Sequence, residues 1–165
     1  MGAINRNLRV PFGAVNLSHD RTYREGWVRH HLVPLQSLRD LTLQPFLSSL
    51  GEGGFHMDDF HTNGILLPTL QSVGKFAGLP VHFGGHPNYN ARIIDELQAI
   101  RGICESIRVG SRRREIALSG VRGLQRRLRD AIANQRSGHV DRVVLSGRTD
   151  GDLDALIDRM IAQKG

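Results

Sequence analysis

The chain of 165 residues is predicted to fold as a single α+β domain. Two short β-prone runs, residues 27–33 and 65–68, lie in the first half of the sequence. In the second half, apolar residues recur at steps of three and four through residues 87–107 and 112–133, which is the spacing of amphipathic helices. A chain of this length can bury one sizeable core but is short for two ordinary domains.

The first third of the chain predicts an arm, a strand and an interrupted helix. Residues 1–26 are polar and arginine-rich, and we interpret them as an N-terminal arm or linker. Residues 27–33 predict the first strand, which Pro34 ends because proline cannot donate a backbone hydrogen bond. Residues 35–50 have helical spacing, with an interruption or kink expected near Pro45.

The middle of the chain is rich in turn signals. Residues 51–54 predict a turn, and residues 55–60 predict a short strand followed by a turn. The pair Asn63-Gly64 precedes the second strand, residues 65–68, and either forms a hairpin turn or shapes a site. Residues 69–81 contain several glycine and proline breaks and predict an irregular connection.

The remaining elements are mostly helical. Pro87 suits the first position of the helix 87–107, and a second helix is expected at residues 112–133. Residues 140–145 predict a short strand or an extended segment. Residues 151–162 predict a terminal amphipathic helix.

Composition favours a polyanionic partner over a membrane. No run approaches the roughly 18 apolar residues that span a bilayer, and the first residues lack the apolar region of a signal peptide. The formal net charge is +6, and lysine occurs only at Lys75 and Lys164. Arginine pairs with phosphate through a planar two-pronged donor, so nucleic acid is the expected partner. The alternative is a solvated surface in an arginine-biased chain. The single cysteine, Cys104, excludes an internal disulfide and a cysteine-based zinc site.

Histidines occur in two spaced groups. His30 and His31 are adjacent on the first predicted strand, where neighbouring side chains point to opposite faces, so the two are expected to do different work. His82 and His86 follow at a spacing of four. A neutral imidazole can accept a proton from water near pH 7, and imidazoles bind divalent transition metals. The sequence therefore predicts a metal-dependent phosphodiesterase site.

The motifs together resemble the AHH family of the HNH/endonuclease VII superfamily, which is found as toxin domains of bacterial polymorphic toxins. The resemblance covers about residues 27–97 and is carried by His30-His31, Asp58-Asp59, Asn63-Gly64 with Leu67-Pro68, and residues 82–90. The alanine that names the family is Arg29 here, so the motif reads Arg-His-His.

The resemblance implies a ββα-metal finger in residues 27–97, surrounded by a mostly helical part in residues 98–165. By motif position, His30, His82 and His86 would hold one divalent metal ion (Zn, Ni, Mn or Mg), and His31 would be the general base. A second interpretation makes His86 a donor to phosphate at the start of the helix that follows. Asn63 would hold the loop or orient His31, and Tyr89 would hydrogen-bond a ligand or the phosphate.

The expected function is hydrolysis of DNA with little sequence specificity. Arg29 and Arg112, Arg113 and Arg114 are the candidate phosphate contacts. The alternatives are an RNase on the same scaffold, a metal-stabilised nucleic-acid-binding module without activity, and an inactive domain that acts through protein partners. If the toxin resemblance holds, the chain would act in the cytoplasm of a bacterial target cell and bind a cognate immunity protein.

Overall fold

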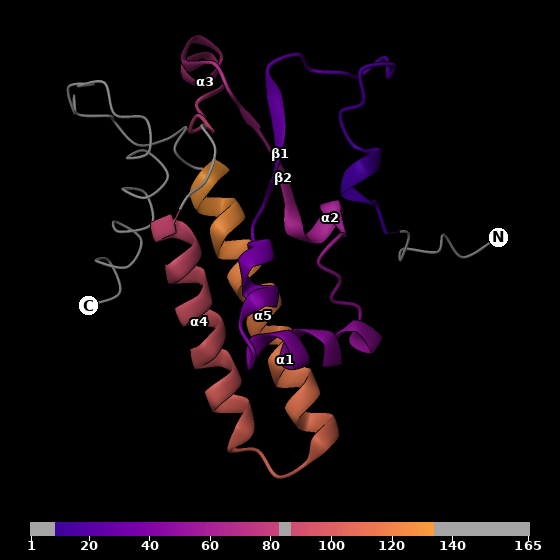
Figure 1. The fold of residues 1–165 in the computed structure, drawn as a ribbon, viewed down its shortest axis with the longest axis vertical. Coiled ribbons are helices and arrows are strands. Elements are labelled where there is room, and N and C mark those ends of the chain that lie inside the picture. The colour runs from indigo at the N-terminus through magenta and orange to yellow at the C-terminus, as the bar shows by residue number, and fades with distance from the viewer. Residues whose placement is uncertain (1–8, 83–86, 134–165) are drawn as a thin grey trace, which may run out of the picture.

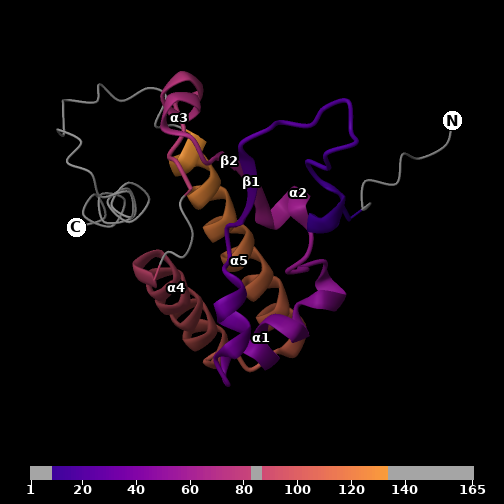
Figure 2. The same ribbon diagram turned by 45° about the horizontal axis from the view of Figure 1, so that its top comes forward.

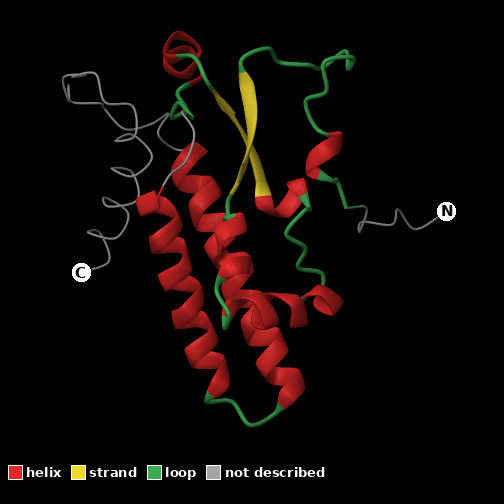
Figure 3. Ribbon diagram, in the orientation of Figure 1, coloured by secondary structure: helices red, strands yellow, loops and turns green. Residues whose placement is uncertain are grey.

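A computed structural model describes residues 9–82 and 87–133 of the chain, which form helices around a small two-stranded antiparallel sheet (Figures 1 and 3). The predicted α+β class is confirmed. In chain order the elements are the 3-10 helix η1 (Phe12–Ala14), β1 (Trp27–His31), η2 (Leu35–Arg39), α1 (Leu43–Ser49), η3 (Gly51–Gly53), α2 (Phe60–Asn63), β2 (Gly64–Pro68), α3 (Gln71–Ala77), α4 (Pro87–Glu105) and α5 (Gly110–Ala133).

The two long helices α4 and α5 lie side by side and form the body of the molecule (Figures 1 and 2). They are joined at the end of the body away from the sheet, while α1 lies across them. Apolar residues spaced three and four apart on each helix meet in one core, as their periodicity predicts. That core contains Leu43, Leu47, Ile93, Leu97, Val121, Leu124, Leu128 and Ile132.

The strands β1 and β2 pair with each other over their whole length, and β1 ends at His31, two residues before the end of the predicted strand 27–33. Trp27 lies opposite Pro68, and His31 lies opposite Gly64. Glycine is required at position 64 because a Cβ atom there would lie 2.2 Å from the ring of Phe60. The Asn63-Gly64 pair is therefore not a hairpin turn; it is the junction between α2 and β2, and the two strands meet over a long connection.

The interruption in residues 35–50 lies before Pro45 rather than at it. The Asp40 carboxylate accepts hydrogen bonds from the backbone N–H groups of Thr42 and Leu43, which ends η2 and starts α1. Pro45 then falls in the first turn of α1, where a missing backbone donor costs nothing.

The prediction of a short strand within residues 55–60 is wrong, because this segment leads into the helix α2. Asp59 caps that helix by accepting from the N–H of His61. Among the described residues only one isolated β-bridge forms here, between Pro11 and Asp59. Next to it, the N–H of Phe60 donates to the Val10 carbonyl at 2.7 Å. The described part of the N-terminal arm is thus bonded to the start of α2.

Residues 69–81 also differ from the predicted irregular connection, because they contain the helix α3. Gly74 is not a break but a close-packing position within α3, where a Cβ atom would lie 2.5 Å from the side chain of Val81. None of the helices in the described residues combines the length and apolarity needed to cross a bilayer. The predicted segments 140–145 and 151–162 lie outside the described residues.

Candidate active site

His30 faces the interior of the molecule from β1. Its side chain is buried, with 7% of its surface exposed. The His30 ring lies 5.1 Å from the ring of His82, centroid to centroid, and 5.2 Å from the ring of Tyr89. The backbone N–H of His82 donates to the carbonyl of Pro68 at 2.8 Å, so the end of β2 holds His82 beside β1.

His31 faces the opposite side of β1 and is half-buried. Its ring stacks on Phe12, with centroids 3.6 Å apart and ring planes 3° from parallel. Phe12 in turn packs edge-on against Phe60 of α2, at 5.1 Å. Burial lowers the pKa of His31 below its usual value, and the negative charge of Asp58 partly opposes that shift. A lowered pKa keeps the imidazole neutral at pH 7, which is the form that accepts a proton.

The pair His30 and His82 fits a shared transition-metal ion. Their centroids are 5.1 Å apart, a separation found both in an edge-to-face ring contact and in two imidazoles that share one ion. Imidazole nitrogens also suit zinc and nickel better than magnesium, which prefers oxygen ligands. No group of three or more His, Cys, Asp or Glu side chains converges within residues 9–82 and 87–133. His86, the third candidate ligand, lies outside these residues.

Tyr89 occupies an interior position on α4. Its side chain is fully buried, and its hydroxyl donates to the carbonyl of Leu32 at 2.6 Å. Burial raises the pKa of the Tyr89 hydroxyl well above its usual value, so the hydroxyl keeps its proton. The structure therefore gives Tyr89 a contact with the chain immediately after the His-His pair, in place of the expected contact with phosphate.

Asn63 is also fully buried, and its side chain joins three parts of the chain. Its amide oxygen accepts from the backbone N–H of Val33 at 2.8 Å, and its amide nitrogen donates to the Val33 and Met57 carbonyls. Gln125 of α5 donates to the same amide oxygen at 3.1 Å. These bonds fix the residues that follow His31, which is the loop-holding role expected of Asn63.

Arg29 shares the face of β1 that carries His31. Its guanidinium donates to the carbonyl of Phe12 at 2.7 Å, so it binds the backbone of the residue that stacks on His31. The side chain is exposed, and this bond uses only one of the five N–H donors of the guanidinium.

A nuclease family of the HNH/ENDO VII superfamily with conserved AHH matches residues 13–128 of the chain. The chain belongs to the AHH nuclease family. No curated protein and no solved structure matches it significantly. Within the matched region, the Arg29-His30-His31 motif forms the last three residues of β1.

The arginines expected to bind substrate at the start of α5 do not lie near the AHH motif. Arg112, Arg113 and Arg114 are at the end of the body where α4 and α5 are joined, away from the sheet (Figure 1). Arg113 donates to the carbonyl of Ile107, and Arg114 pairs with Glu52 at 3.1 Å. The arginines that α5 brings to α2 come from its second half.

Three features of the AHH site had little or no local signal in the sequence. Phe12 lies in the segment interpreted as an arm, and nothing near it in sequence predicts its stacking on His31. Asp58 belongs to the motifs that carry the family resemblance, but that resemblance implies no role for it, and its charge acts on His31. Gln125 is a polar residue on the apolar face of α5. Because buried polar groups need hydrogen-bond partners, its position in the sequence indicated that it has one.

Proposed function

We propose that this AHH family member is a metal-dependent endonuclease that hydrolyses DNA with little sequence specificity. The observation that carries the proposal is the division of the histidine pair by β1. His30 faces inward beside His82, whereas His31 faces outward beside Asp58. One strand thus supplies a metal-binding side chain and a proton acceptor that do not compete for the same ligand.

In this mechanism His31 accepts a proton from the attacking water. The oxygen of that water forms a bond to phosphorus, and the bond between phosphorus and the 3′ oxygen breaks. His30 and His82, with His86 as a further candidate, would hold a divalent ion. When bound there, such an ion would supply the positive charge that offsets charge on the phosphate and on the leaving oxygen.

The surrounding residues keep His31 in position for this step. Phe12 covers one face of the imidazole, so water reaches the ring only from its other side or its edge. Asn63 and Gln125 fix the chain after His31, and Tyr89 fixes the carbonyl of Leu32. A base held in one orientation reaches the water without the entropic cost of finding it.

The direct test is to incubate supercoiled plasmid with the purified chain and each of zinc, nickel, manganese and magnesium. We expect nicked and then linear DNA with at least one ion, and loss of cleavage after chelation by EDTA. His31→Ala should remove cleavage, and His19→Ala, at an exposed histidine on the arm, should not. Circular dichroism after chelation separates loss of activity from unfolding. Full activity of His31→Ala would contradict the base assignment.

An RNase on the same scaffold is the alternative. Equal masses of plasmid and total RNA, digested side by side under the ion conditions that support cleavage, separate the two substrates. Faster loss of RNA would replace DNA with RNA as the substrate.

We also propose that the chain acts as a toxin in the cytoplasm of a bacterial target cell and is neutralised by an immunity protein. The net charge of +6 supports an acidic partner, because opposite charges speed association and exclude wrong partners. Expression of the chain in a bacterial host should stop growth, and His31→Ala should relieve that arrest. Coexpression with acidic small proteins encoded beside its gene should rescue growth, and failure of all of them would count against this partner.

A further inference from the structure

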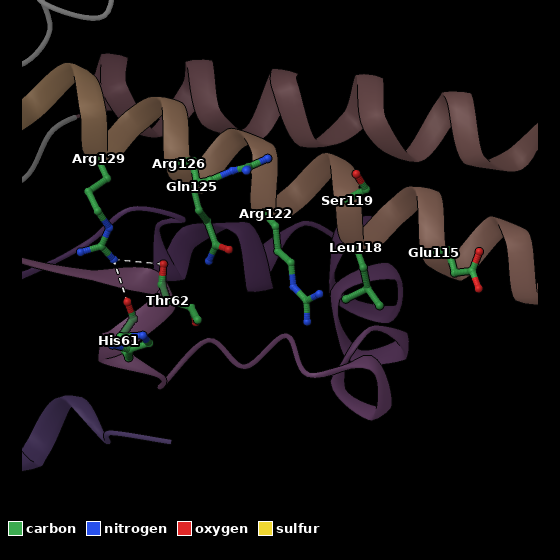
Figure 4. A pocket seen from close by; sticks show the side chains of 9 residues that line it. All are labelled: His61, Thr62, Glu115, Leu118, Ser119, Arg122, Gln125, Arg126 and Arg129. Carbon is green, nitrogen blue, oxygen red and sulfur yellow. Dashed lines mark hydrogen bonds between the residues drawn. The ribbon is translucent and has the colours of Figure 1, made fainter. Parts of the chain in front are cut away.

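A groove of about 550 Å³ lies between α5 and α2, apart from the histidine pair (Figure 4). The side chains on the α5 side come from successive turns of one face of the helix and include three arginines. The lining residues are His61, Thr62, Glu115, Leu118, Ser119, Arg122, Gln125, Arg126 and Arg129.

Two of the arginines are held across the groove by neutral acceptors. Arg129 donates to the carbonyls of His61 and Thr62 at 2.9 and 3.3 Å, as Figure 4 shows, and Arg122 donates to the carbonyl of Gly53 at 3.0 Å. A carbonyl orients a guanidinium without cancelling its charge. Each guanidinium has five N–H donors, so donors remain for a ligand.

The groove has an excess of positive charge. It is lined by three arginines and, among the described residues, by one carboxylate, that of Glu115. Arg126 is exposed on the groove face of α5, between Arg122 and Arg129. Burial lowers the pKa of Arg129, and the charge of Asp130 opposes that shift. A partly desolvated cation of this kind is stabilised by an anionic ligand.

The spacing of the arginines matches a nucleic-acid strand. Residues 122, 126 and 129 lie on one face of α5 and span about 10 Å along the helix axis. One strand of duplex DNA carries a phosphate about every 3.4 Å along the duplex axis, so α5 would span roughly three phosphates if it lay parallel to that axis. The geometry therefore suits a row of phosphates better than a single small anion.

The groove is also joined to the candidate active site through α2. His61 lines the groove, and the preceding residue, Phe60, packs on Phe12, which stacks on His31. A strand held in the groove would therefore approach the base along α2.

We propose that this groove binds the phosphodiester backbone of the nucleic-acid substrate beside the bond that is cleaved. This proposal rests on the proposed nuclease function. It assigns substrate binding to the second half of α5 instead of to the arginines at the start of that helix. Among the described residues Arg126 is bonded to no carboxylate or carbonyl, so it is the arginine of the groove that is freest to contact phosphate.

Binding of a fluorescent 20-base-pair DNA duplex, measured by anisotropy over a range of NaCl concentrations, tests the groove. The full-length His31→Ala chain is the parent, so that the probe is not cut. Arg126→Gln should raise Kd roughly five- to tenfold at 0.1 M salt and reduce the slope of log K against log salt by about 0.9, the value for one lost phosphate contact. Arg39→Gln is the matched control, because Arg39 is an exposed arginine at the end of η2 that does not line the groove. It should change neither quantity.

Each remaining outcome has a defined meaning. Unchanged DNA binding by Arg126→Gln, or an equal loss of binding in Arg39→Gln, would overturn the proposed role of the groove. If polyglutamate binding falls in Arg126→Gln while DNA binding does not, the groove is a site for an acidic protein and the proposal is wrong. Plasmid nicking by the wild-type chain is scored separately. If the wild-type chain nicks plasmid but Arg126→Gln binds DNA normally, only the proposed role of the groove is wrong. If the wild-type chain does not nick plasmid but Arg126→Gln binds DNA more weakly, only the proposed nuclease function is wrong.

Discussion

Phe12 and His31 stack face to face, with ring centroids 3.6 Å apart, although they come from the N-terminal arm and from the end of β1. Phe12 has 7% of its surface exposed, and its carbonyl accepts from Arg29. The stack fixes the plane of the candidate base and shields one of its faces from water. Phe12 is therefore a positioning residue in the proposed mechanism.

Phe12→Leu should lower kcat by about tenfold and leave KM within about twofold, because a misoriented base weakens the chemical step more than substrate binding. Phe12→Tyr should keep most of the activity, since the ring remains. Steady-state nicking rates measure the split between kcat and KM, and the His31 ring-proton resonances should lose their ring-current shift in Phe12→Leu. A matched control is Tyr23→Leu, at an aromatic residue that is 43% exposed. Equal effects of Phe12→Leu and Phe12→Tyr would contradict a role for the aromatic face.

Metal loading should distinguish the two histidines of β1. His30→Ala and His82→Ala should each lower zinc or nickel affinity by at least about tenfold, because each removes one imidazole ligand. His31→Ala should bind the metal like the wild-type chain. Isothermal titration with each metal provides the measurement, and it does not depend on cleavage. Normal metal binding by His30→Ala would show that His30 is not a ligand.

Asn63→Ala should destabilise the fold by about 2–4 kcal/mol, because it leaves the buried backbone N–H of Val33 and the amide of Gln125 without their shared acceptor. Gln125→Ala should cost less, since Asn63 keeps its bonds to Val33 and Met57. Urea unfolding of both variants and of the double variant measures the coupling. Additive effects of the two changes would mean that the bond between these side chains contributes little.

Tyr89→Phe should lower stability by about 1–2 kcal/mol and leave KM unchanged. The variant keeps the ring but removes the hydroxyl that donates to the buried Leu32 carbonyl. Thermal unfolding and the KM for a DNA substrate measure the two effects separately. A raised KM with unchanged stability would restore the expectation that Tyr89 contacts phosphate.

Asp40 should contribute to the loss of folding stability at low pH. Hydrogen bonds from Thr42 and Leu43 lower its pKa from 3.8 to about 2, so the folded chain favours the ionised carboxylate. The unfolded chain binds the proton more readily, and this contribution is therefore complete above about pH 4 and is lost as the pH falls toward 2. Asp40→Asn should flatten the loss of stability between pH 4 and 2, measured by urea unfolding at several pH values. An unchanged slope would exclude Asp40 as a source of the acid sensitivity.

Local patterns were sufficient for the regular elements of the fold. A β-prone run ended by Pro34 predicted a strand at residues 27–33, of which 27–31 form β1, and steps of three and four predicted α4 and α5. These patterns are local because a strand or helix repeats its geometry every two or 3.6 residues. The errors fell on α2 and α3, short helices that are held by long-range contacts such as the one between Phe60 and Val10.

For the candidate site too, some features were predictable from the sequence and others were not. The sequence by itself determined the α+β class, the family and the adjacent histidines, and strand alternation required that His30 and His31 face opposite sides. Only the tertiary structure decided that Phe12 stacks on His31, that Gln125 reaches Asn63 across 62 positions of chain, and that the second half of α5 rather than its start faces α2. These contacts join residues far apart in the chain. They follow from how the whole core packs, which no local repeat encodes.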